Sequence, residues 1–157
     1  MPNLLLTHDA RIIEDWIDYN GHLRDAFYLL LFSHATDALM DHLGLDASGR
    51  ALHQHTLYTL EAHINYVAET RLGEQVQVFT HLLDHDSKRL HVLHQLHRRE
   101  DAQLLAASEQ MLMNINVQAG RAAKFAAPVQ ACVDSLFAEH AALPRSGYCG
   151  RVIGIRR

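Results

Sequence analysis

Residues 16–44, WIDYNGHLRDAFYLLLFSHATDALMDHLG, combine a tight turn with a long apolar helix. The Asn-Gly pair is a strong turn signal, because both residues tolerate positive φ. Beyond it, apolar residues recur at three- and four-residue spacing, which predicts a helix over residues 25–43. Asp25 suits the first turn of this helix and Gly44 suits its C-terminal stop. Apolar residues cover most of its circumference, so we expect a buried central helix.

The rest of the chain has mainly strand character, with alternating Thr, Tyr, Ile and Val between short turns. Residues 89–99 and the first half of 104–117 also suit a helix, but their regular spacing to the neighbouring segments favours strands. Residues 45–55 are predicted to be a polar loop, and Pro128 opens a second helix. The predicted strands are residues 4–14, 56–69, 75–83, 89–99 and 104–117.

This order of elements predicts an α+β fold in which one helix packs against a curved, five-stranded antiparallel sheet, followed by a C-terminal helix. The 157 residues suffice for one domain, which we expect over residues 1–143. Residues 144–157 hold three glycines and four arginines and are expected to form a loosely ordered tail. One helix cannot cover both faces of such a sheet, so a second copy is expected to complete it as a symmetric dimer.

The overall composition narrows the classes of partner. The formal net charge is −4, whereas nucleic-acid binding needs a basic face. The two cysteines form neither a disulfide framework nor a zinc pattern. The first residues lack the basic and apolar regions of a signal peptide, and no apolar run approaches the ~20 residues of a membrane span. We therefore expect a cytoplasmic protein that binds neither nucleic acid nor membrane.

The position of Asp18 relative to the helix start suggests chemistry. Free N–H groups at a helix start can polarise a carbonyl oxygen or stabilise developing negative charge. A carboxylate a few residues upstream can attack that carbonyl or activate a water. The simpler alternative is that Asp18 only builds the turn and Asp25 only caps the helix.

Several stretches together resemble the hotdog-fold acyl-CoA thioesterases of the 4-hydroxybenzoyl-CoA thioesterase type, over roughly residues 5–140. Within that group the chain is most similar to the betainyl-CoA thioesterases of carnitine breakdown, which also occur fused to carnitine dehydrogenase. The stretches that carry the resemblance are WIDYNGH (16–22), LFSHATDALMDHLGLD (31–46), LYTLEAHINY (57–66), LLDHDSKRLHVLHQLHR (82–98) and SEQML (108–112).

The resemblance implies hydrolysis of a short or polar acyl-CoA, specifically betainyl-CoA to betaine and CoA, with no cofactor because CoA is part of the substrate. The family's catalytic carboxylate corresponds to Asp18, as nucleophile or as general base. Its carbonyl-polarising amide corresponds to the backbone N–H of Asp25. Arg24 departs from the Asn or Thr found in many relatives. The resemblance further implies a homodimer or a dimer of dimers, with active sites at the subunit interface.

Other residues are candidates for contacts with such a substrate. Glu61 and His22 are added to the catalytic group, although Glu61 could equally face solvent and His22 could simply bond the turn. A trimethylammonium acyl group would be held by aromatic faces, including Tyr66, with a carboxylate nearby. CoA phosphates need local positive charge. The proposed substrate-binding residues are Trp16, Tyr19, Asn20, Gly21, Tyr28, Tyr58, Arg89, Arg121 and Lys124. Taken one at a time, each aromatic residue could equally be a core residue, and each basic residue could be a solvated surface charge.

The sequence also allows two other activities and suggests a metal site. A hotdog hydratase places an Asp and a His close together, as Asp18 and His22 could be, but its spacing and flanking proline are absent. A non-catalytic acyl-CoA-binding module is the other rival. Among the thirteen histidines, His91 and His97 would share a strand face but lie roughly 20 Å apart. No carboxylate or cysteine completes a set with them, so no metal is expected.

Overall fold

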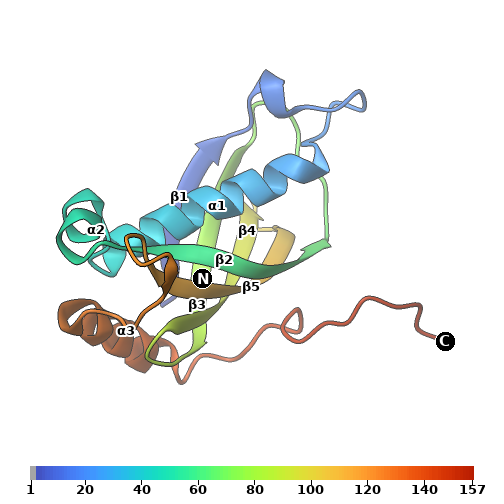
Figure 1. Ribbon diagram of the computed structural model, residues 1–157. Helices are drawn as coiled ribbons and strands as arrows, with labels where there is room; N and C mark the ends of the chain where they lie inside the picture. The colour runs from blue at the N-terminus through green and yellow to red at the C-terminus, as the bar shows by residue number, and fades with distance from the viewer. Residues whose placement is uncertain (1–2) are drawn as a thin grey trace.

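The computed structural model describes residues 3–157 and contains one antiparallel sheet and three α-helices (Figure 1). The strand order is β1-β3-β4-β5-β2, and the two-residue β6 pairs with β5. The prediction of an α+β fold with five main strands and a C-terminal helix is confirmed. In chain order the elements are β1 (Leu5–Arg11), the 3-10 turn η1 (Glu14–Trp16), α1 (Asp25–His42), α2 (Ala47–His53), β2 (His55–Tyr66), β3 (Gln75–His85), β4 (Arg89–Arg98), β5 (Leu104–Asn116), β6 (Arg121–Ala122) and α3 (Ala127–His140).

Helix α1 lies across the concave face of the sheet (Figure 1). It ends where Gly44 adopts a φ of +88°, which an L side chain rarely tolerates. Its buried face packs on strand residues such as Val78 and Leu96. The opposite face is open, and Leu29 is 44% exposed. The predicted central helix is therefore buried on its sheet-facing side and exposed on the other side in a single copy. The buried residues of α1 are Tyr28, Leu31, Phe32, Ala35, Thr36, Leu39 and Met40.

One segment differs from its sequence prediction, and two segments for which helix and strand were both open are strands. Residues 45–55, predicted to be a loop, contain α2, because Asp46 caps its start by accepting a hydrogen bond from Gly49 N at 2.8 Å. The segments whose helix or strand character was open, 89–99 and 104–117, are the paired strands β4 and β5. Each has a ladder on both sides, and this tertiary pairing overrides the helical propensity of Leu104–Ala107.

The segment after α3 contains no helix or strand. Its first half is attached to the convex face of the sheet: Arg145 Nη2 donates to Leu83 O at 3.0 Å, and Gly150 N donates to Glu109 Oε1 at 2.8 Å. Tyr148 and Cys149 pack against a small buried cluster there. Beyond Gly150 the chain runs outward from the body (Figure 1). Within residues 3–157, no helix is both long and apolar enough to cross a bilayer.

Candidate active site

The turn after η1 fixes one oxygen of the Asp18 carboxylate and leaves the other open. Asp18 N donates to His22 O at 2.9 Å and Gly21 N donates to Asp18 O at 3.0 Å, with Gly21 at a φ of +78°. Asp18 Oδ1 accepts hydrogen bonds from the backbone N–H groups of Asn20 (2.8 Å) and His22 (3.2 Å). Across residues 3–157, Oδ2 accepts no hydrogen bond. Asp18 thus builds the turn and still presents a free oxygen.

The same turn is attached to two neighbouring segments. Arg24 N donates to Trp16 O, and Leu23 N donates to Thr70 O, both at 2.9 Å. These bonds place the start of α1 beside the connection that leaves β2, which is residues 67–71. Two parts of the chain almost fifty residues apart therefore meet at the site.

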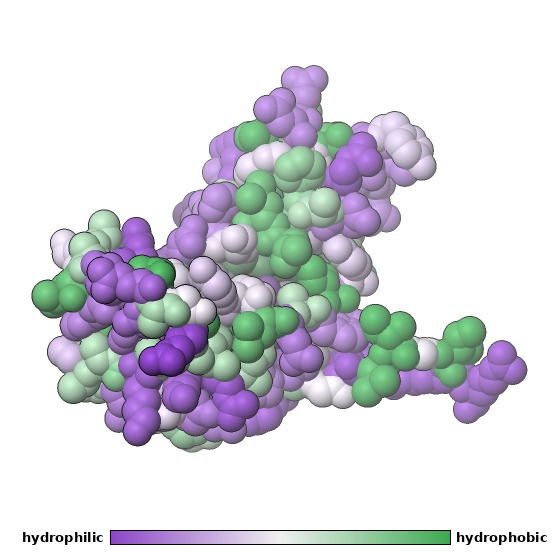
Figure 2. Space-filling view, in the orientation of Figure 1, coloured by the Kyte–Doolittle hydropathy of each residue, from purple (hydrophilic) through white to green (hydrophobic). Residues whose placement is uncertain are grey.

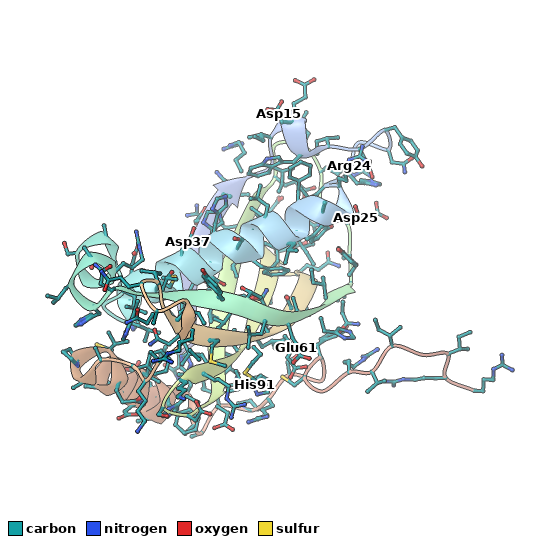
Figure 3. The ribbon with its side chains drawn as sticks, in the orientation of Figure 1. Asp15, Arg24, Asp25, Asp37, Glu61 and His91 are labelled. Atoms are coloured by element: carbon teal, nitrogen blue, oxygen red, sulfur yellow. The ribbon has the colours of Figure 1, made fainter. Side chains whose placement is uncertain are left out.

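The start of α1 carries an open amide. Arg24 precedes the helix in an extended conformation and its side chain makes no capping hydrogen bond. Asp25 Oδ1 accepts from Ala26 N at 2.9 Å, while in the described part of the chain Asp25 N donates to no acceptor. Figure 3 shows Arg24 and Asp25 together at this end of the helix. An unpaired N–H at a helix start is suited to bind a carbonyl oxygen or an oxyanion.

A cavity of about 470 Å³ joins the carboxylate to the helix start. It also includes Glu69, which the sequence did not single out. Glu69 Oε2 lies 2.6 Å from His22 Nε2, so the imidazole of His22 is paired with Glu69 and not with the side chain of Asp18. The lining residues are Asp18, Tyr19, His22, Leu23, Arg24, Asp25, Tyr28, Tyr66, Val67, Ala68 and Glu69.

Two tyrosines form one wall of this cavity. Tyr66 OH donates to Asp25 O at 3.1 Å, and Tyr28 OH donates to Ala68 O at 3.3 Å. Their rings meet edge to face with centroids 5.1 Å apart. Burial, with Tyr66 and nearby carboxylates, raises the pKa of Tyr28 to about 12, and burial and Asp25 raise the pKa of Tyr66. Both phenols therefore remain protonated donors near neutral pH.

Several predicted site residues lie outside this cavity. The ring of Trp16 stacks on Phe27, with centroids 6.2 Å apart. Asn20 and Gly21 form the exposed tip of the turn, and only the Asn20 backbone contacts the Asp18 side chain. Tyr58 is an exposed residue of β2. Of the predicted aromatic residues, only Tyr19, Tyr28 and Tyr66 line the cavity.

Glu61 does not reach Asp18 in one copy of the chain. A bulge in β2 at Leu60 interrupts the strand alternation, so Glu61 does not share a face with Thr59 as the alternation predicts. Glu61 is exposed and lines a different cavity of about 500 Å³, together with His91 and Glu109. Figure 3 shows Glu61 and His91 well away from Asp25.

The predicted phosphate-binding residues also lie elsewhere. Arg89 is the first residue of β4, at the far end of the sheet, and its guanidinium Nη2 is 2.6 Å from Oδ2 of Asp86 in the turn from β3. Arg121 and Lys124 are exposed and follow the end of β5, at that same far end of the sheet. Of the arginines, Arg24 is the one that lines the Asp18 cavity.

The histidines of β4 have separate protein partners. His91 Nε2 lies 2.7 Å from Glu109 Oε2, and His97 Nδ1 lies 3.1 Å from Ala102 O. His94 is buried between two threonines. Within residues 3–157, no group of three or more His, Cys, Asp or Glu side chains could hold a metal ion.

Comparison with known proteins identifies the family. The model of the Thioesterase-like superfamily matches residues 14–133. The chain is 49% identical over 155 residues to the betainyl-CoA thioesterase of Pseudomonas aeruginosa, covering 99% of this chain and 98% of that protein. It is 40% identical over 135 residues to the L-carnitine dehydrogenase/betainyl-CoA thioesterase of Agrobacterium fabrum, which covers 86% of this chain and 28% of that protein.

Solved structures agree with this assignment. A Pseudomonas putida KT2440 protein assigned to the thioesterases superimposes with a TM-score of 0.87 at 46% identity, covering 100% of this chain and 99% of that one. A Staphylococcus aureus protein solved in complex with CoA superimposes with a TM-score of 0.90 at 29% identity, covering 98% and 97%. The family model, the sequence identities and the shared fold together show that the chain belongs to the thioesterase-like, hotdog-fold superfamily.

Proposed function

We propose that this protein is an acyl-CoA thioesterase that hydrolyses betainyl-CoA to betaine and CoA. The observation that carries the proposal is that Asp18 and Asp25 line the same cavity. In residues 3–157, Asp18 Oδ2 accepts no hydrogen bond and Asp25 N–H donates none. The similarity to the P. aeruginosa betainyl-CoA thioesterase supports the choice of acyl group. The hydratase alternative requires His22 to act together with Asp18, whereas the His22 imidazole is paired with Glu69. The described residues therefore do not favour hydration over hydrolysis.

In the proposed mechanism, the thioester carbonyl oxygen accepts a hydrogen bond from Asp25 N–H, with the helix dipole behind it. Asp18 Oδ2 then either removes a proton from a water that attacks the carbonyl carbon, or attacks it directly to form a mixed anhydride that water cleaves. In both routes the C–S bond breaks, CoA leaves as its thiol and one water is consumed. General-base attack puts the water oxygen directly on betaine, whereas water that attacks the Asp18 carbonyl carbon of the anhydride leaves its oxygen on Asp18 and releases betaine with the oxygen that Asp18 supplied. Hydrogen bonds from Asn20 and His22 to Oδ1 keep the carboxylate oriented.

The proposed assembly is a homodimer, or a dimer of such dimers, with active sites at the interface. Strand β2 is at one edge of the sheet, and Figure 2 shows apolar surface over α1 and β2. Leu29 of α1 and Leu60 and Tyr66 of β2 are exposed apolar or aromatic side chains. Antiparallel pairing of two β2 edges would bring the far end of one sheet toward the Asp18 cavity of the other. Arg121 or Lys124 of the partner subunit could then reach the CoA phosphates. Analytical ultracentrifugation of the wild type and Leu60→Glu tests this assembly.

The proposed setting is a cytoplasmic role in carnitine breakdown. It is supported by relatives in which a betainyl-CoA thioesterase is joined to L-carnitine dehydrogenase in one chain, of which this chain spans about 28–30%. Loss of growth on carnitine as sole carbon source after gene deletion, with growth on betaine retained, tests this role.

The catalytic proposal is tested by thiol release from a panel of acyl-CoAs. Asp18→Asn keeps an oxygen for the two turn hydrogen bonds but cannot act as base or nucleophile, so kcat should fall about 10²- to 10⁴-fold without unfolding. Asp15→Asn is the matched control, since Asp15 is an exposed carboxylate in η1 that does not line the cavity. A fully active Asn variant would refute the role of Asp18. Transfer of ¹⁸O from water into Asp18 during repeated turnover would identify it as the nucleophile.

A further inference from the structure

The size of the betainyl group limits where its charge can lie, given the proposed function. One methylene separates the thioester carbon from the quaternary nitrogen, so the two atoms are roughly 2.5 Å apart by standard bond lengths and angles. A carbonyl placed between Asp18 and Asp25 N–H therefore holds its trimethylammonium inside the same cavity. Side chains of the same subunit that line only other cavities cannot touch it.

The carboxylates around this cavity outnumber its guanidinium groups. Three carboxylates (Asp18, Asp25 and Glu69) and one guanidinium (Arg24) line it. The His22 ring lies between the turn and Glu69. Asp18 and Asp25 already accept hydrogen bonds from backbone N–H groups. Glu69 likewise has one paired oxygen, Oε2, which lies 2.6 Å from His22 Nε2, and one oxygen, Oε1, that accepts no hydrogen bond from any residue between 3 and 157. Unlike Asp18, it has no part in the proposed reaction. Its side chain is 66% exposed, so Oε1 is accessible to a ligand in the cavity.

The backbone on either side of Glu69 is held firmly. Arg98 Nη2 donates to Glu69 O at 2.9 Å, and the same guanidinium is bound to Glu74 through Nε at 2.8 Å. Leu23 N donates to Thr70 O. The Glu69 carboxylate therefore extends from a fixed main chain, which suits a recognition role.

An aromatic face completes the surroundings. The hydroxyl of Tyr66 is bonded to Asp25 O, which holds the ring beside the helix start, and this residue is 53% exposed. The buried ring of Tyr28 packs edge to face against the Tyr66 ring. A trimethylammonium has no N–H to donate, so it is recognised by ring faces and by nearby negative charge. Both are present here within one cavity.

We propose that Glu69, together with the ring of Tyr66, selects quaternary-ammonium acyl groups in this enzyme. Glu69 is a specificity-determining residue, and the reaction itself stays with Asp18 and the helix start. Glu61 is excluded from this role within one subunit because it lines the separate cavity with His91 and Glu109.

The test compares two thioesters of equal shape. Betainyl-CoA and 3,3-dimethylbutanoyl-CoA differ only in a charged nitrogen against a neutral quaternary carbon. Glu69→Gln keeps the size of the side chain and an oxygen for His22. It should lower kcat/KM for betainyl-CoA about tenfold at low salt and change that for the neutral analogue less than twofold. Tyr66→Leu should reduce the same preference, and Tyr66→Phe should largely keep it.

Controls separate this inference from its rivals. Glu100→Gln removes an exposed turn carboxylate outside every cavity described above. It should leave kcat/KM unchanged for both thioesters. An equal loss on both thioesters in Glu69→Gln would overturn the inference, because it would mean that Glu69 only positions His22. A change in preference in Glu61→Gln instead of Glu69→Gln would also overturn it.

Binding measurements keep the inference testable apart from turnover. Calorimetric Kd values for both thioesters with Asp18→Asn, and with Asp18→Asn/Glu69→Gln, need no hydrolysis. A preference for the charged ligand that disappears with Glu69 supports the inference. Equal affinities for the two ligands in both variants overturn it. Failure of wild-type protein to hydrolyse either thioester would count against the proposed function and would leave this binding result to be judged by itself.

Discussion

The Nδ1 atom of His94 lies 2.7 Å from the hydroxyl oxygen of Thr80, in the interior between β4 and β3. On the other side of the ring, Nε2 lies 3.0 Å from Thr36 Oγ1, and Thr36 donates to Phe32 O at 3.3 Å. With the Thr36 proton so directed, Nε2 donates and Nδ1 accepts. This neutral imidazole connects α1 to the sheet beneath it.

Stability should therefore fall on acidification. Burial lowers the pKa of His94 to about 3 from 6.5, so between these values the unfolded chain binds a proton that the folded protein does not. From pH 7.5 to 5.5 this one group costs about 1.3 kcal/mol of unfolding free energy. Urea unfolding of wild type and His94→Gln at both pH values measures it. Between pH 7.5 and 5.5 the unfolding free energy of His94→Gln should fall by about 1.3 kcal/mol less than that of the wild type. Equal falls in the two proteins would contradict the role given to His94.

Gly21→Ala should reduce both stability and activity. The φ of +78° costs an alanine about 1 kcal/mol, although its Cβ would meet nothing within 4 Å. Relief of this strain shifts the turn that carries Asp18, and we expect kcat/KM to fall about tenfold or more. Gly150→Ala is the matched control, with a φ of +68°, equally open space and a position in the C-terminal segment after α3. It should show the same loss of stability with unchanged thiol release. Full activity in Gly21→Ala would mean that the turn tolerates displacement.

Arg98→Lys should affect the site from a distance. Its guanidinium binds Glu74, Asp101, the Gln103 side chain and Glu69 O, a set that one ammonium cannot reproduce. Loosening residues 67–71 should raise KM for betainyl-CoA several-fold and change kcat little. Arg99→Lys is the control, because Arg99 is exposed and its nearest acidic group is Asp9 at 3.7 Å. Steady-state kinetics of the two variants decide, and identical KM values would argue against this positioning role.

Truncation should locate the end of the folded unit. Deleting residues 151–157 should change the free energy of unfolding by less than about 0.5 kcal/mol, since Val152, Ile153 and Ile155 are 84–88% exposed. Deleting 144–157 uncovers the cluster formed by Leu83, Leu93 and Ala107, and should cost on the order of 2 kcal/mol. Urea titrations compare the two. A large loss in the shorter deletion that varies with protein concentration would instead place residues 151–157 in a subunit contact.

Local signals in the sequence determined the parts of this protein that depend on short-range physics. The apolar spacing and Gly44 define α1, and the alternation of apolar residues defines the strands. The Asn-Gly turn and the helix start put Asp18 and Asp25 on the wall of one cavity, because the two residues lie close together in the chain.

Only the tertiary structure decided which distant residues join that pair. Glu69 and Tyr66 reach the cavity because the connection after β2 bonds to the turn, a contact that leaves no periodic signal in the sequence. The bulge at Leu60 moves Glu61 off the face that strict alternation assigns to it. Arg121 pairs with Asn116, the last residue of β5, at the opposite end of the sheet. Register, bulges and strand order are set by the sum of many weak packing and hydrogen-bond terms, which no local window of sequence contains.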